Sequence, residues 1–427
     1  MAEAYSIVGG RLIDPEQGLD GNFDLHIADG RVLAVGAPPQ GFEAARIDAQ
    51  GCVICPGLID LHARLREPGQ EHKGTIASET AAAAAGGVTT LCCPPDTDPV
   101  IDTPAVIRLI RQRAEEAGHA RVLPLGALTL GLAGERLAEM NELREAGCIG
   151  YSNAAHPITN TLVMRRAMEY AASCGLPVFL AAEDAFLSPK GYAHEGAVST
   201  RLGLPGLPES AETIIVARDL LLIEQTGVRA HFCKLSTARA VQMVGEAQRR
   251  GLPVTAQVTA HHLHLSEMDL GYFNSDCHVQ PPLRTQRDME GLRAGLASGV
   301  ISAVCSDHQP HDPDAKLAPF SESEPGISAL ETLLPLALRL GEQRVMSLPD
   351  VVARLTRDPA RILGIDAGHL RPGAAADVCV FDPERYWTLA AEGMHSRGRN
   401  TPFLGWEFKG RVTHTFLAGR LVYQARD

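Results

Sequence analysis

The sequence lacks the features that direct a protein to a membrane or to nucleic acid. No apolar run reaches the roughly 18 residues needed to span a bilayer. The N-terminus, Met-Ala-Glu-Ala-Tyr-Ser-Ile, has no basic region followed by an apolar stretch, which argues against a secretory signal. Positive charge is scarce, because 39 Lys and Arg residues face 51 Asp and Glu residues and give a net charge of −12. This balance disfavours nucleic acid and anionic membranes as partners, so we expect a cytoplasmic protein.

Low-complexity linkers and internal repeats are also missing, although the chain is long enough, at 427 residues, to bury a large core. Cysteine is present but shows no framework. The ten cysteines are scattered through apolar segments, which is typical of reduced thiols used as small core residues. Cys52 and Cys55 form a C-x-x-C pair without a second pair. The cysteines therefore predict neither a disulfide scaffold nor a metal site.

Short apolar runs alternate with helical stretches over residues 53–365. For example, the alanine-rich segment 75–86 precedes the apolar run 88–93. Seven or eight such units predict a (β/α)₈ barrel, in which functional residues follow the carboxyl ends of the strands. Residues 1–52 and 366–427 instead consist of short alternating strands and turns. We expect these two ends to pair into one small β-sandwich domain that flanks the barrel.

The segment from Pro56 to Gly69 nearly forms a metal-hydrolase motif. A strand that ends in His-x-His directs both imidazoles to the same side, where they can share one divalent ion. Here the first position is His62 and the second is Arg64. Arginine is a permanent cation without a lone pair to donate, so the pair is broken.

Further motifs give this segment a family context. They are His62-x-x-Leu-Arg-Glu-Pro-Gly69, His261-His-Leu-His-Leu, Pro281-Pro-Leu-Arg284, Ser306-Asp-His-x-Pro-His311 and Asn400-Thr-Pro-Phe-x-Gly405. With them the chain resembles the dihydroorotase branch of the amidohydrolase superfamily over nearly its whole length. The Arg-Glu-Pro-Gly run favours dihydroorotase over its hydantoinase and allantoinase relatives.

The resemblance implies a centre of two zinc ions held by a His-x-His pair, a carboxylated lysine, two more histidines and an aspartate. Only the first histidine and the aspartate are present in this chain. The six positions, which we term the vestigial metal positions, are His62, Arg64, Ser152, Ala181, Lys234 and Asp307. Two ligands fall short of the roughly three that a zinc site needs. We therefore expect no metal, no other cofactor and no catalytic residue, since no group remains to activate water.

Loss of the metal would leave the carboxylate of Asp307 as a buried anion, and buried charges need partners. Arg64, Lys234 or both are expected to pair with it. The family likeness also implies four vestigial substrate positions, which are Arg66, Asp96, His308 and His311. Arg66 either binds a carboxylate, as in the family, or serves as a structural ion-pair partner. Asp96 stands where the family has asparagine and should repel a carboxylate, unless Arg66 neutralises it.

These observations predict a catalytically inactive dihydroorotase homologue. Family likeness implies a partner, the catalytic chain of aspartate carbamoyltransferase, in a hetero-oligomer that also self-associates and serves pyrimidine biosynthesis. One alternative is an active cyclic-amide hydrolase with a remodelled single-metal or metal-free site. Another is a sensor that binds a carboxylated pyrimidine through Arg66 without turning it over.

Overall fold

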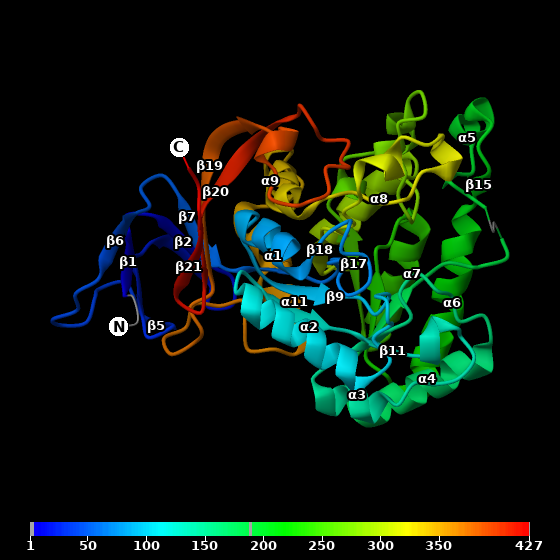
Figure 1. The fold of residues 1–427 in the computed structure, drawn as a ribbon, viewed down its shortest axis with the longest axis horizontal. Coiled ribbons are helices and arrows are strands. Elements are labelled where there is room, and N and C mark those ends of the chain that lie inside the picture. The colour runs from blue at the N-terminus through cyan, green and yellow to red at the C-terminus, as the bar shows by residue number, and fades with distance from the viewer. Residues whose placement is uncertain (1–3, 188–189, 427) are drawn as a thin grey trace.

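A closed barrel of parallel strands forms the larger part of the computed structural model, which describes residues 4–187 and 190–426 (Figure 1). Hydrogen bonds between neighbours run in the order β8–β9–β10 and β11–β12–β13–β16–β17–β18, and β11 continues β10 across Leu125. A parallel bridge between Ala63 and His308 closes the ring. The strands are β8 (Leu58–Asp60), β9 (Val88–Cys93), β10 (Arg121–Pro124), β11 (Gly126–Ala127), β12 (Tyr151–Ser152), β13 (Val178–Ala181), β16 (Ala230–Cys233), β17 (Val254–Thr259) and β18 (Ala303–Cys305).

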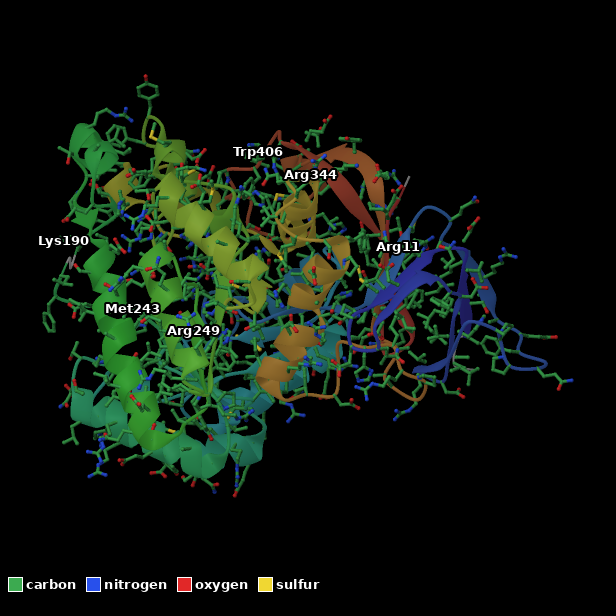
Figure 2. The ribbon with its side chains drawn as sticks, turned by 180° about the vertical axis from the view of Figure 1, so that it is seen from behind. Arg11, Lys190, Met243, Arg249, Arg344 and Trp406 are labelled. Carbon is green, nitrogen blue, oxygen red and sulfur yellow. The ribbon has the colours of Figure 1, made fainter. Side chains whose placement is uncertain are left out.

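Helices cover the outside of this barrel (Figure 1). Local sequence starts them: Thr75 caps α1 by accepting the Ser78 N–H, and Thr237 caps α7 by accepting the Ala240 N–H. In Figure 2, Met243 and Arg249 mark α7 on the outer layer. The helices are α1 (Ile76–Ala85), α2 (Pro104–Ala117), α3 (Met140–Ala146), α4 (Thr161–Cys174), α5 (Ala197–Leu202), α6 (Glu209–Thr226), α7 (Ala238–Arg249), α8 (Gln286–Ala297), α9 (Leu333–Glu342), α10 (Leu348–Leu355) and α11 (Arg357–Leu363). Strands β14 (Ala193–His194) and β15 (Gly206–Leu207) form a small parallel pair near α5.

Two sheets built from both chain ends make the flanking domain, where Arg11 marks β2 in Figure 2. One sheet has the order β5–β4–β1–β6 and the other the order β21–β20–β19–β7–β2–β3. Their facing side chains, among them Ile7, Ile54 and Phe416, form one buried cluster. The strands are β1 (Tyr5–Val8), β2 (Arg11–Asp14), β3 (Leu19–Asn22), β4 (Leu25–Ala28), β5 (Arg31–Val35), β6 (Ala45–Asp48), β7 (Val53–Pro56), β19 (Val378–Thr388), β20 (Glu407–Leu417) and β21 (Arg420–Gln424).

The predicted fold class, a (β/α)₈ barrel with a flanking β-sandwich, is confirmed. Strand β7 lies within residues 53–365, the range predicted for the barrel, yet it pairs with β2 and β19 in the flanking sheet. The barrel therefore begins after Pro56, because the first strand of the predicted range supplies the centre of the sandwich instead. Within the described residues, no helix is long and apolar enough to cross a membrane.

Candidate functional site

The vestigial metal positions converge at one end of the barrel. His62 and Arg64 follow β8, Lys234 follows β16, and Asp307 follows β18. All of these strands are parallel, so their carboxyl ends open on the same side. Lys234 and Asp307 have φ values of 52° and 48°, in the left-handed region that is costly for side chains other than glycine. The barrel mouth therefore holds its side chains on a strained backbone, as functional sites commonly do.

Asp307 is buried, and four nitrogen-bearing side chains contact its carboxylate; one of them is Gln309, whose Nε2 donates to Oδ1 at 3.1 Å. The Nζ of Lys234 lies 3.2 Å from each carboxylate oxygen. The Nη1 of Arg64 and the Nε2 of His62 lie 3.6 Å and 3.5 Å from Oδ1. Burial alone raises the pKa of Asp307, but the positive charges of Lys234 and Arg64 hold it below its ordinary value. The expectation that Arg64, Lys234 or both pair with Asp307 is confirmed, and both cations contact the carboxylate.

Asp96 has a different partner from the one considered. Its Oδ2 accepts a 2.7 Å hydrogen bond from the Nε of Arg64, and the pKa of Asp96 stays below its ordinary value although burial opposes ionisation. Arg64, and not Arg66, thus neutralises this carboxylate most directly. Arg64 bridges Asp96 and Asp307, so two cations and two anions balance at this end of the barrel.

Ser152 and Ala181 contribute no ligand for a metal. The Ser152 hydroxyl donates to the Phe179 carbonyl at 2.9 Å and accepts from the Ala154 N–H at 3.0 Å. Ala181 lines a cavity of about 40 Å³ beside Lys234. A space of that size accommodates waters, whereas substrate pockets are typically about 300–1,000 Å³.

The residues present do not fit a two-zinc centre. His62 and Asp307 are the retained donors, and the cations Lys234 and Arg64 stand where ligands are needed. Within residues 4–187 and 190–426, no group of three or more His, Cys, Asp and Glu side chains is placed to hold a metal. Zinc bound here would have to sit against two positive charges with too few lone pairs.

Burial keeps the imidazoles of His62, His261 and His262 neutral. Burial and then Lys234 lower the pKa of His62 well below its ordinary value, and the same two causes lower the pKa of His261 to about 3. The ring nitrogens of both residues have no hydrogen-bond partner in the described part of the chain. The neighbouring His262 contacts Thr259 Oγ1 and the Pro282 carbonyl. None of these rings changes its charge near neutral pH, where a general acid–base catalyst must work.

Of the vestigial substrate positions, Arg66 and His311 come together. Arg66 donates to the Pro310 carbonyl at 2.9 Å and to Gln70 Oε1 at 3.3 Å, and its Nη2 lies 3.1 Å from His311 Nε2. These partners are neutral groups. Arg66 therefore braces the loop that carries His311, and within the described part of the chain it forms no direct ion pair of the kind considered from the sequence.

His308 faces away from this pair. Its Nδ1 accepts the Ala329 N–H at 3.0 Å, so its Nε2–H donates to Glu79 Oε2 at 2.7 Å. Glu79 also accepts from Ser396 Oγ at 2.6 Å, which ties the barrel to the segment after β19. The role of Glu79 was not predicted. A carboxylate inside an alanine-rich, buried helix is the signal that could have found it, since such a charge needs a buried partner.

Solved structures with the same fold include an L-hydantoinase from Arthrobacter aurescens, with a TM-score of 0.88 and 23% identity over 99% of this chain and 96% of that one. A dihydropyrimidinase from Brevibacillus agri has a TM-score of 0.84 and 21% sequence identity, and the match covers 99% of this chain and 95% of that one. The fold is thus that of the amidohydrolase barrels. The family model described as dihydro-orotase-like matches residues 51–240, and the amidohydrolase family model matches residues 325–423.

Full-length relatives narrow this class. A protein named dihydroorotase-like from Pseudomonas putida is 52% identical over 98% of this chain and 99% of its own length. A protein of the same name from Pseudomonas aeruginosa is 50% identical over 98% of this chain and 99% of its own length. A protein named dihydroorotase from Syntrophotalea carbinolica is 45% identical over 99% of both. This chain belongs to the dihydroorotase-like family.

Proposed function

We propose that the chain is a catalytically inactive dihydroorotase homologue that acts as an assembly subunit of aspartate carbamoyltransferase in pyrimidine biosynthesis. The observation that carries the inactive part is the position of Lys234 and Arg64, whose positive charges contact Asp307 where the family holds zinc. A hydrolase of this type needs the metal to lower the pKa of water from 15.7 to about 7.

The surrounding groups offer no replacement for that metal. Asp307 is ion-paired, with a pKa below its ordinary value, and is a poor base. His62 and His261 stay neutral and buried. Proton transfer at neutral pH works best with groups whose pKa lies near 7, and these lie far from it.

The partner part of the proposal rests on family likeness together with the intact scaffold. The barrel and the sandwich span nearly the whole length of the relatives, yet the described residues at the barrel mouth hold no set of metal ligands. This combination suits a subunit that acts through its surface. The relatives at 52% and 50% identity carry the name dihydroorotase-like, whereas one at 45% is named dihydroorotase.

Two measurements on one preparation test the proposal. The purified chain is incubated with zinc and assayed in both directions, for the ring opening of dihydroorotate and for the ring closing that forms dihydroorotate from its open-chain product. A dihydroorotase relative is the positive control. It is then mixed with the aspartate carbamoyltransferase chain of the same organism and analysed by size exclusion with light scattering. We expect no turnover and a defined hetero-oligomer. Metal-dependent or metal-free turnover would establish the alternative hydrolase, and separate elution of a fully active carbamoyltransferase would overturn the partner assignment.

Rebuilding the ligand set tests the inactive site directly. A variant with Arg64→His, Ser152→Lys, Ala181→His and Lys234→His restores the missing donors, and Asp96→Asn removes the carboxylate that would lose Arg64. Zinc measured by elemental analysis should be retained by this variant after dialysis and absent from the parent chain. Equal zinc retention by both proteins would show that the cations do not block the site.

A further inference from the structure

A cavity of about 290 Å³ lies at the end of the barrel opposite the vestigial metal positions. Its walls are the last turn of α2, the start of β10, and the turn between β20 and β21. Arg121 opens β10, which runs parallel to β9, so this wall belongs to the face where the barrel strands begin. The cavity therefore lies at the junction between the barrel and the flanking domain, and the site described above makes no use of it.

The inner walls of this cavity are apolar. Ala114, Ala120, Val122 and Leu417 are buried, and Leu123 is half-buried. The volume is close to the lower limit of about 300 Å³ for ligand pockets, which combine apolar walls with a few polar groups that orient the ligand. The cavity therefore suits a small organic molecule with an apolar body.

The charged side chains that line the cavity are mainly arginines. Arg111, Arg420 and Glu115 are exposed, whereas Arg121 is partly exposed and forms an ion pair with Asp377. Within the part of the chain that the structure describes, Arg111, Arg420 and Glu115 form no ion pair with one another or with a neighbour. The unpaired charges of the lining thus sum to +1. In a chain with a net charge of −12, this local excess favours an anion.

The two unpaired guanidinium groups use few of their donors. Arg420 Nη2 donates to the Gly118 carbonyl at 3.0 Å, and Arg111 Nη1 donates to the Ala146 carbonyl at 3.4 Å. Each guanidinium carries five N–H donors, so most of them remain for a ligand. The contact with Gly118 also satisfies a carbonyl at the C-terminal end of α2, where the helix dipole would otherwise oppose an anion.

We propose that this cavity binds a small monocarboxylic acid, with its apolar body against Val122 and Leu417 and its carboxylate held by Arg111 and Arg420. Guanidinium groups bind carboxylates through charge-assisted hydrogen bonds, and one carboxylate balances the unpaired charge of +1. Arg111 belongs to α2 and Arg420 to β21, so the ligand connects the barrel with the flanking domain. This inference goes beyond the proposed function and holds whether or not the chain assembles with a carbamoyltransferase.

Calorimetric titration of the full chain with octanoate at pH 7 tests the proposal. Octanoate joins an apolar chain to one carboxylate, octanamide is its uncharged counterpart, and inorganic phosphate is an anion without an apolar body. We expect saturable binding of one octanoate per chain with a Kd below about 1 mM, and binding of octanamide and phosphate that is weaker by about tenfold or more.

Charge variants of the lining locate the bound octanoate. Arg111→Met and Arg420→Met each remove one cation and should weaken octanoate binding about tenfold. Glu115→Gln removes the unpaired carboxylate and should tighten binding about threefold, a gain that damage to the fold cannot produce. Arg108→Met is the matched control, because Arg108 is exposed on the same helix but does not line the cavity, and it should leave the affinity unchanged.

Thermal melting shows which variants are folded, and Arg420→Lys, which keeps the charge and should retain most of the affinity, serves if Arg420→Met does not fold. Three results would overturn the proposal. The first is a parent chain that shows no saturable binding of octanoate. The second is octanamide or phosphate that binds as tightly as octanoate, because the cavity would then select for apolar surface alone or for charge alone. The third is folded arginine variants with the affinity of the parent.

Discussion

Replacing Lys234 with methionine should measure how strongly the cations stabilise the buried Asp307. With Lys234 Nζ at 3.2 Å from both oxygens, the attraction is about 5 kcal/mol at an effective dielectric constant of 20. Loss of one partner of a buried pair typically costs about 3–5 kcal/mol. Arg64 and His62 remain at 3.6 Å and 3.5 Å. We therefore expect Lys234→Met to lower the free energy of unfolding by about 3 kcal/mol, at the lower end of that range.

The double-mutant cycle separates charge pairing from packing. Asp307→Asn alone leaves Lys234 without its carboxylate, whereas Lys234→Met with Asp307→Asn removes both charges. The combined variant should therefore be more stable than the sum of the single losses predicts, by about 2 kcal/mol. Urea unfolding followed by circular dichroism at pH 7 gives the values. Lys409→Met is the control. Lys409 pairs with the exposed Glu384, so this substitution should lower the free energy of unfolding by less than about 1 kcal/mol.

The pH dependence gives an independent reading of the same pair. The folded pKa of Asp307 is lowered, so its contribution to stability is present above the unfolded pKa of about 4 and is lost as the pH falls through the folded value. Lys234→Met should weaken this dependence, since Lys234 lowers the pKa of Asp307 more than any other neighbour and so opposes the effect of burial. A coupling energy within about 0.5 kcal/mol of zero, with an unchanged pH profile, would refute the ion-pair account.

Three other perturbations have defined outcomes. Burial raises the pKa of Asp219 to about 6, so the folded state binds the proton more tightly and stability falls as the pH rises from about 4 to 6. Asp219→Asn should remove about 3 kcal/mol of that decline in urea unfolding series, and parallel curves for both proteins would contradict it. Glu79→Gln should lower the free energy of unfolding, measured by calorimetry, by about 2 kcal/mol, because His308 loses a charged hydrogen-bond acceptor. An unchanged melting temperature would argue against that role of Glu79. Gly57→Ala places a Cβ 2.8 Å from Thr89 Cβ and should cost about 1–3 kcal/mol, and a neutral result would mean that β9 shifts freely.

Periodicity in the sequence was enough to predict the barrel but not its first boundary. Strand β7, Val-Ile-Cys-Pro, is buried along its whole length, as the barrel strands β8, β9, β16 and β18 are. A continuous apolar run shows that a strand is covered on both faces and does not show which sheet it joins. Its pairing with β19, more than 300 residues away, follows from tertiary structure.

The placement of the residues at the vestigial metal positions, at the strand ends of the barrel, could be predicted, because each lies in a short motif whose neighbours fix its place. The partners of their charges could not. Asp96 is 32 residues from Arg64 in the sequence, and choosing between Arg64 and Arg66 depends on side-chain direction. Glu324 lies in a polar loop whose composition gives no sign that its carboxylate reaches Lys73. Motifs locate charges along the chain, whereas only the fold decides which charges meet.

Charge balance links the ionised side chains of the barrel mouth to one another. Arg64 and Lys234 supply two positive charges, and Asp96 and Asp307 supply two negative ones, all within contact of a neighbour of opposite sign. Changing Arg64 to histidine alone would strand Asp96, and changing Lys234 alone would weaken the neutralisation of Asp307. Each single step toward a metal site therefore costs stability before it gains a ligand. The ion-pair network is a self-consistent packing solution for the barrel, and it opposes zinc binding unless several residues change together.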